Sequence, residues 1–250
     1  MKKFVILVFC IVSVALVTSA QTKKNTRPAE AVKPNITKEL PDSKIKFTYE
    51  FTNPRFLVSK VVINHDENGF GTVTWEKTNV EKPITVNVEL SKKTMSDLRE
   101  LWGKLNFLDS DTHYQSPVRD YGHLGTIRVT MDDDGKRRTE TFNWTEDLDA
   151  RALGEEYKAI GNQYMWVFDF NLARSMQPLE APNLMKALDS QLRRKQIADP
   201  FALVDYLNKV QEDESVPLIA RNHAGRILKV IESNKKKAEE EATKAKSGVD

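Results

Sequence analysis

The hydrophobic residues change their spacing at Ser91, and this change limits what the chain can fold into. Before it, every second residue from Ile84 to Leu90 is apolar, and residues 47–51 alternate in the same way. Strict alternation is typical of a β-strand with one buried face. After it, apolar residues recur at helical spacing: Met95, Leu98, Leu101, Trp102, Leu105 and Leu108. Since serine is a favourable N-cap residue, we expect strands up to residue 90 and then an amphipathic helix that begins at Ser91.

A second hairpin and a second helix follow. The alternating apolar residues from Ile127 to Met131 lead into an Asp-rich turn at 132–135, and a return strand extends to Trp144. A long helical pattern then covers residues 147–176. The order of strands, helix, hairpin and helix predicts an α+β domain over residues 45–178, an antiparallel sheet with helices packed on one face.

The rest of the chain is predicted to be helical. Pro178 and Pro182 interrupt the preceding helix, and residues 179–233 carry further apolar stripes at helical spacing, which predicts a small all-helical C-terminal region. The Lys/Glu/Ala-rich residues 234–250 have no apolar face to pack, so we expect a charged, disordered tail there.

Residues 199–232 resemble a single HEAT-type unit of two antiparallel helices. The resemblance rests on Pro217, Ala220, Arg221 and Ala224 near the start of the second helix. Because a solenoid needs about three or more repeats, the resemblance implies a helical appendage that packs on the sheet domain.

The N-terminus carries an export signal. Lys2 and Lys3 precede an almost continuous apolar run from Phe4 to Val17, and small residues lead up to Ala20. This order is typical of a secretory signal peptide (residues 1–20) cleaved after Ala20; the alternative is an uncleaved anchor. No later apolar run is long enough to cross a bilayer. We therefore expect an exported protein, periplasmic or extracellular, with the proline-containing residues 21–44 as a disordered linker.

Cleavage of the signal also changes the composition. The chain has 38 Lys and Arg residues, 36 Asp and Glu residues and one cysteine. The signal contains that cysteine, Cys10, and two of the basic residues but no acidic residue, so the mature chain is formally neutral. A mature chain without cysteine excludes disulfides, cysteine zinc sites and thiol chemistry. Without a basic excess, we expect no nucleic-acid binding.

Asp109, Asp111 and His113 form the first candidate site. They alternate after the first predicted helix, and in an extended segment their side chains would share one face. Carboxylates and imidazole are ligands for divalent metals. A polar loop after a helix gives the same pattern, because Asp and Ser favour turns. We predict no cofactor from these residues, and the metal site stays an alternative.

Arg119, Asp120, Tyr121 and His123 form the densest polar and aromatic cluster, in the loop before the second hairpin. Loops often carry functional groups, and an aspartate beside a histidine can orient the imidazole. No serine lies in a Gly-x-Ser-x-Gly elbow, so a hydrolase would lack a recognisable nucleophile. The alternative is that these side chains hold the loop in place.

As a whole, the chain resembles exported bacterial proteins whose sheet-and-helix domain has no assigned function. The resemblance rests on the Gly69-x-Gly71 hairpin, the helix after Ser91 and the hairpin from Ile127 to Phe142. Such fold-level features imply no activity.

Three hypotheses follow. The leading one is a non-enzymatic, exported protein-interaction module with an unknown protein partner. The second is a metal-assisted hydrolase that uses Asp109, Asp111, His113, Asp120 and His123. The third is a structural or assembly protein of the cell envelope.

Overall fold

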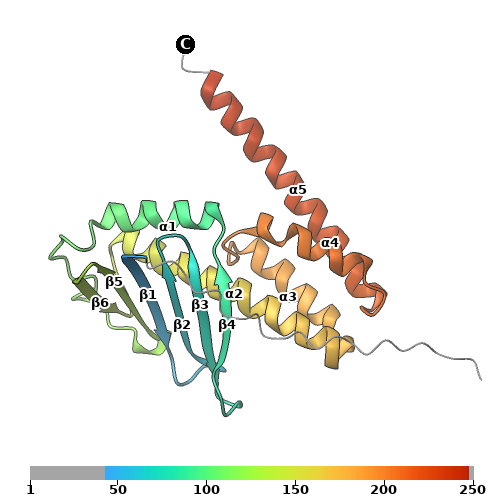
Figure 1. Ribbon diagram of the computed structural model, residues 1–250, viewed down its shortest axis with the longest axis horizontal. Coiled ribbons are helices and arrows are strands. Elements are labelled where there is room, and N and C mark those ends of the chain that lie inside the picture. The colour runs from blue at the N-terminus through green and yellow to red at the C-terminus, as the bar shows by residue number, and fades with distance from the viewer. Residues whose placement is uncertain (1–42, 248–250) are drawn as a thin grey trace, which may run out of the picture. The chain divides into compact units, whose positions relative to one another are not determined.

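The computed structural model describes residues 43–247 and shows an α+β fold (Figure 1). Six antiparallel strands form one sheet in the order β4-β3-β2-β1-β5-β6. The strands are β1 (Ile45–Thr52), β2 (Val58–Asp66), β3 (Phe70–Lys77), β4 (Ile84–Glu89), β5 (Thr126–Asp133) and β6 (Lys136–Phe142). The predicted signal peptide and almost all of the predicted linker lie outside the described residues.

The helices are α1 (Lys92–Leu105), α2 (Leu148–Met176), α3 (Ala181–Arg193), α4 (Val204–Glu212) and α5 (Leu218–Ser247). The described residues also contain three short 3-10 helices: η1 (Gly122–Leu124) lies before β5, η2 (Pro178–Glu180) before α3 and η3 (Pro200–Leu203) before α4. The predicted fold class, an antiparallel sheet with a helical C-terminal region, is confirmed. Ser91 caps α1 as predicted, because its hydroxyl accepts a hydrogen bond from the Thr94 amide.

β1 lies inside the sheet because it pairs with β2 on one side and with β5 on the other. Strands β1 to β4 follow one another as a meander, whereas β5 returns to the free side of β1 only after α1. Ile45 pairs with Asp133 and Thr52 with Thr126. This register brings the loop before β5 beside the turn that joins β1 to β2.

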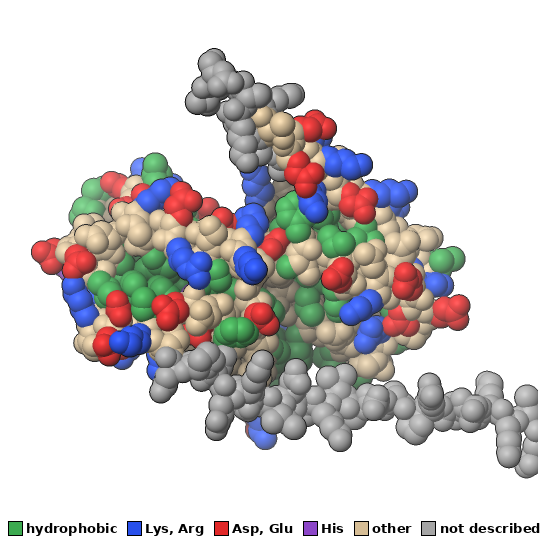
Figure 2. All heavy atoms as spheres, turned by 45° about the horizontal axis from the view of Figure 1, so that its top comes forward, with side chains coloured by type: hydrophobic (Ala, Val, Ile, Leu, Met, Phe, Trp, Pro, Cys, Tyr) green, Lys and Arg blue, Asp and Glu red, His purple; other side chains and the backbone are tan. Residues whose placement is uncertain are grey.

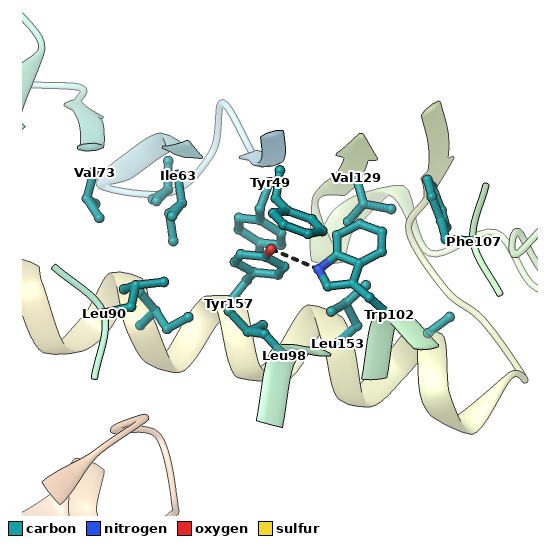
Figure 3. Close-up of a cluster of buried hydrophobic side chains, with 14 of the residues drawn as sticks. Tyr49, Ile63, Val73, Leu90, Leu98, Trp102, Phe107, Val129, Leu153 and Tyr157 are labelled. Carbon is teal, nitrogen blue, oxygen red and sulfur yellow. Dashed lines mark hydrogen bonds between the residues drawn. The ribbon is translucent and has the colours of Figure 1, made fainter. Parts of the chain in front are cut away.

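One face of the sheet is buried under α1 and α2. Tyr49, Ile63 and Val129 point from three strands toward Leu98 of α1 and Tyr157 of α2, as Figure 3 shows. All five side chains are buried. The strand residues occupy the positions that the alternating pattern assigns to a buried face.

The opposite face of the sheet is polar. One row of paired residues crosses all six strands with only threonine and asparagine: Asn87, Thr72, Asn64, Thr48, Thr130 and Thr139. Hydrogen bonds link neighbours on this face, for example from Thr48 to Asn64 at 2.9 Å. The sheet is therefore two-sided, with one apolar and one polar face.

A second core lies among the C-terminal helices, and α2 belongs to both cores. Its buried side chains include Trp166, Phe170, Met185, Leu188, Leu207, Val210 and Ile227. Trp166 and Phe170 come from the second half of α2, so this core begins well before the predicted boundary at residue 179. The second half of α2 reaches the second core because the helix is longer than the strands that it covers. α2 has 29 residues and is about 43 Å long. The eight residues of β1 span only about 26 Å.

α5 continues to Ser247 through most of the segment for which the sequence predicts a disordered tail, residues 234–250. Lys, Glu and Ala are strong helix formers, and the first turns of α5 are held in the second core by Ala220, Ala224 and Ile227. The packed start therefore supports a helix that continues without an apolar face. Across residues 43–247, no helix combines the length and the apolar character that a bilayer crossing requires.

Charges of both signs are mixed on the surface. Figure 2 shows Lys and Arg side chains interspersed with Asp and Glu over the face in view. This mixture agrees with the near balance of 38 basic and 36 acidic residues.

Candidate functional site

All seven candidate residues lie in the loop that joins α1 to β5. Asp109 forms an ion pair with Lys136 of β6. Asp111 is exposed. The His113 imidazole is 86% exposed and lies 3.4 Å from the Glu140 carboxylate. These three side chains therefore contact different partners or solvent, although they alternate in the sequence.

The Arg119–His123 cluster is held by amide side chains through its backbone and the Asp120 carboxylate. Gln115 donates a hydrogen bond to the Arg119 carbonyl at 2.9 Å. Asn143 donates to the Asp120 carboxylate and accepts from the Tyr121 amide at 3.1 Å. Asn53 donates to the His123 carbonyl at 3.0 Å. These contacts fix the course of the loop.

The structure brings only part of the predicted cluster together. The rings of Tyr121 and His123 lie 5.7 Å apart, and Tyr121 packs edge-on against Trp144. Within residues 43–247, no three His, Cys, Asp or Glu side chains are grouped closely enough to hold a metal ion. The contacts favour the interpretation of this segment as a polar loop held in place, and the metal-assisted hydrolase hypothesis gains no support from them.

Arg138 of β6 also holds this loop, and the sequence prediction missed it. Its guanidinium donates to the Phe107 carbonyl at 2.6 Å and to the Glu140 carboxylate at 3.0 Å, and it lies over the Phe107 ring. The Arg138 side chain is only 14% exposed. Its spacing in the sequence could have indicated this role. Arg138 and Glu140 precede the buried Phe142 at two-residue intervals, which places them on the same, inward-facing side of the strand.

A chain of buried polar groups connects the sheet to both covering helices. The Trp102 indole of α1 donates to the Tyr157 hydroxyl at 3.1 Å, and that hydroxyl lies 2.8 Å from Nε2 of His65. His65 Nδ1 lies 2.8 Å from the Asp66 carbonyl. Because a carbonyl only accepts, Nδ1 carries the proton and Nε2 accepts from Tyr157. Burial lowers the pKa of His65 below its usual value, so the imidazole is neutral.

His65 belongs to the core. It is 3% exposed and stacks on Phe47 with ring centroids 4.9 Å apart. The sequence carried a signal for this placement, because His65 follows Val61 and Ile63 at two-residue spacing on the buried face of β2.

A cavity of about 400 Å³ lies between the sheet and α2, beside the candidate loop. Leu124, the residue after His123, forms part of its wall. Most of its lining is apolar: Tyr49, Phe51, Phe56, Val58, Val61, Leu124 and Met165. Lys158 and Asn162 of α2 supply its polar side chains. The loop that carries the predicted polar cluster thus borders an apolar cavity, although the polar residues of the cluster do not line that cavity.

Gly125 fixes the wall of this cavity. Its φ is +95°, a backbone conformation that residues other than glycine rarely adopt. A Cβ atom at this position would lie 2.5 Å from the Phe51 ring. Glycine therefore allows the loop to pass close to Phe51, while the hydrogen bond from Asn53 to His123 ties the loop to the neighbouring turn.

The outer edge of β4 is the second candidate surface. Leu90 donates its amide to the Gly69 carbonyl at 2.9 Å, which fixes the phase of the β3–β4 ladder. Since hydrogen-bonded pairs alternate in an antiparallel ladder, the amides and carbonyls of Thr85 and Asn87 point away from β3. The Glu89 carbonyl accepts from the Tyr164 hydroxyl of α2 at 2.8 Å. Within residues 43–247, no backbone hydrogen bond outside the sheet ladder involves Thr85 or Asn87.

In comparisons with known proteins, no protein-family model and no curated protein matches this chain. The cavity and the β4 edge are the features of the structure that bear on its function.

Proposed function

We propose that this chain is an exported, non-enzymatic protein that binds an extended segment of a partner protein along β4. The observation that carries the proposal is the pair of outward-pointing backbone positions, Thr85 and Asn87, which keep donors and acceptors available at the end of the sheet. Such an edge is a template for strand addition.

The two edge strands of the sheet, β4 and β6, differ in a way that favours strand addition at β4. β6 carries the exposed charges of Lys136 and Arg137, and charged side chains discourage strand addition. β4 carries one exposed charge, Glu89, at its end, and the exposed side chains at its middle, Thr85 and Asn87, are uncharged. Ile84 and Val86 are half-buried, so a partner strand would gain apolar contact on the side of the helices.

The open part of the edge is short. Pro83 precedes it, and the Tyr164 hydroxyl occupies the carbonyl of Glu89 at its other end. An added strand would therefore form its backbone bonds over a few residues only. Specificity would come from its alternate side chains, which would lie beside Ile84 and Val86.

The test is affinity capture from the envelope fraction with the mature chain as bait, compared with Asn87→Pro and Asn87→Ala. Proline lacks the outward amide but leaves the bonds to β3 intact. Alanine removes only the side chain and is the matched control. We expect a partner to be retained by the wild type and by Asn87→Ala and lost by Asn87→Pro.

A melting curve of each variant shows whether it is folded. Retention of the same partner by a folded Asn87→Pro variant would exclude β4 as the binding edge. Recovery of no partner with any bait would contradict a binding role, and a captured envelope polymer would favour the assembly hypothesis instead.

A further inference from the structure

The cavity beside Leu124 has the properties of a small-molecule site. Its volume of about 400 Å³ lies within the roughly 300–1,000 Å³ typical of ligand pockets. Two large apolar side chains in its lining are partly open to solvent, since Phe56 is 46% and Leu124 is 42% exposed. An apolar ligand would cover surface that is otherwise in contact with water.

The polar groups of the cavity restrict the ligand further. Lys158 is exposed on α2 and is the basic residue of the lining. Among residues 43–247 it forms no ion pair. The Asn162 amide nitrogen is already used, because it donates to the Gln196 carbonyl at 3.2 Å. An apolar cavity with one uncompensated ammonium group favours a ligand with an apolar body and one negative charge.

A second cavity, of about 350 Å³ near α1, differs in this respect. Its lining carries charges of both signs, Glu67, Arg99 and Asp109, and each of them has a polar partner: Arg99 donates to the Glu67 carbonyl at 2.8 Å, the Glu67 carboxylate accepts from the Ser43 hydroxyl at 3.2 Å, and Asp109 pairs with Lys136. Because its lining is mixed in sign, this cavity does not favour an anion in the way that the single basic residue Lys158 does.

We propose that the cavity between the sheet and α2 binds a small amphipathic anion of the fatty-acid class. The hydrocarbon chain lies against Phe51, Val61 and Met165, and the carboxylate meets the Lys158 ammonium group. This site is separate from the β4 edge, so either proposal stands if the other fails.

The experiment is isothermal titration of the mature chain with hexanoate, octanoate and decanoate, and with octanol and octylammonium as charge controls. Each buried methylene should tighten binding about fourfold. Octanoate should bind about two- to fivefold more tightly than octanol, as expected for a solvent-accessible ion pair. Octylammonium should bind more weakly than octanol, because its charge repels Lys158.

Two pairs of variants localise the site. Lys158→Gln should abolish the difference between octanoate and octanol, and Lys158→Arg should retain it. Phe56→Ser should weaken binding of all chains about fivefold. Leu57→Ser, at a 62% exposed neighbour outside the lining, should leave binding unchanged.

Several results would overturn the proposal: no binding of any carboxylate at millimolar concentration, affinity independent of chain length, or octylammonium binding as tightly as octanoate. Equal effects of Phe56→Ser and Leu57→Ser would also overturn it. If Phe56→Ser does not fold, the Lys158 pair still decides the outcome, because that side chain is exposed.

Discussion

The Tyr157 hydroxyl satisfies two buried groups at once, so its removal should be costly. It accepts from the Trp102 indole and donates to His65 Nε2, and both of these residues are almost fully buried. Tyr157→Phe keeps the ring and leaves both groups without a partner. An unsatisfied buried donor or acceptor costs about 1–3 kcal/mol. Since two groups lose their partner, we expect the free energy of unfolding to fall by about 2–6 kcal/mol.

Tyr49→Phe is the matched control. Tyr49 is also buried, at 2% exposed, and stacks on the Tyr157 ring at 5.0 Å between centroids. Among the described residues its hydroxyl has no hydrogen-bond partner, and burial alone raises its pKa. Its removal should change the free energy of unfolding by less than about 0.5 kcal/mol, a value typical of substitutions that remove no specific interaction.

The loss should also depend on pH. Burial lowers the pKa of His65 in the folded state below the usual 6.5, so the unfolded chain takes up the proton first as the pH falls. Wild-type stability should therefore decrease below about pH 6.5. In the wild type, protonation of His65 breaks the hydrogen bond from the Tyr157 hydroxyl to Nε2. In Tyr157→Phe this bond is already absent, so protonation costs the variant less. The difference in free energy of unfolding between the two proteins should therefore be larger at pH 8 than at pH 5.

Urea unfolding followed by tryptophan fluorescence at pH 5 and pH 8 measures both effects. A loss below about 1 kcal/mol for Tyr157→Phe would refute the inferred hydrogen-bond chain. Equal losses for Tyr157→Phe and Tyr49→Phe would show that the rings, not the hydroxyl, matter. An effect independent of pH would refute the assigned proton positions.

Four further predictions concern other residues. Gly125→Ala should lower the free energy of unfolding by about 1–3 kcal/mol, because the alanine would have to adopt a positive φ and its Cβ would clash with the Phe51 ring. Urea unfolding measures this loss, and an unchanged free energy of unfolding would contradict it. Arg138→Ala should cost about 2 kcal/mol or more and speed amide exchange in residues 107–112, whereas the exposed Arg137→Ala should do neither. Burial and the Asp97 carboxylate raise the pKa of Glu156 to about 7, so the folded chain keeps this proton at pH values where the unfolded chain has lost it. The free energy of unfolding should therefore fall as the pH rises from about 4.5 to 7. In the same unfolding assay, Glu156→Gln should raise the free energy of unfolding at pH 8 but not at pH 5. Mass spectrometry of the exported protein should find Gln21 as its first residue, and an intact N-terminus would support an anchor instead.

The elements of the fold were predictable from local patterns, but their pairing was not. Alternation located the strands, and Ser91 marked the start of α1, because both signals depend on neighbouring residues. The position of β1 between β2 and β5 depends on contacts between distant segments, which no local period encodes. The same limit explains the boundary placed at residue 179, since nothing within α2 shows where the sheet beneath it ends.

The candidate site was predictable only as a location. The loop before β5 was selected because it gathers Asp120, Tyr121 and His123, yet the residues that hold it include Asn53 and Asn143, on other elements. The cavity arises where the loop meets β1, β2 and α2, so it has no signature in any one segment.

The inner position of β1 has a consequence for the order of folding. Glu50 and Arg128, which form an ion pair across β1 and β5, are 78 residues apart in the chain. Contacts over such separations form slowly, because closing a long loop costs chain entropy before the contact can compensate for it. The four-stranded meander can form early, but one side of β1 stays unpaired until β5 arrives. Fragments that end before Thr126 should therefore present β1 as a second open edge and associate with one another.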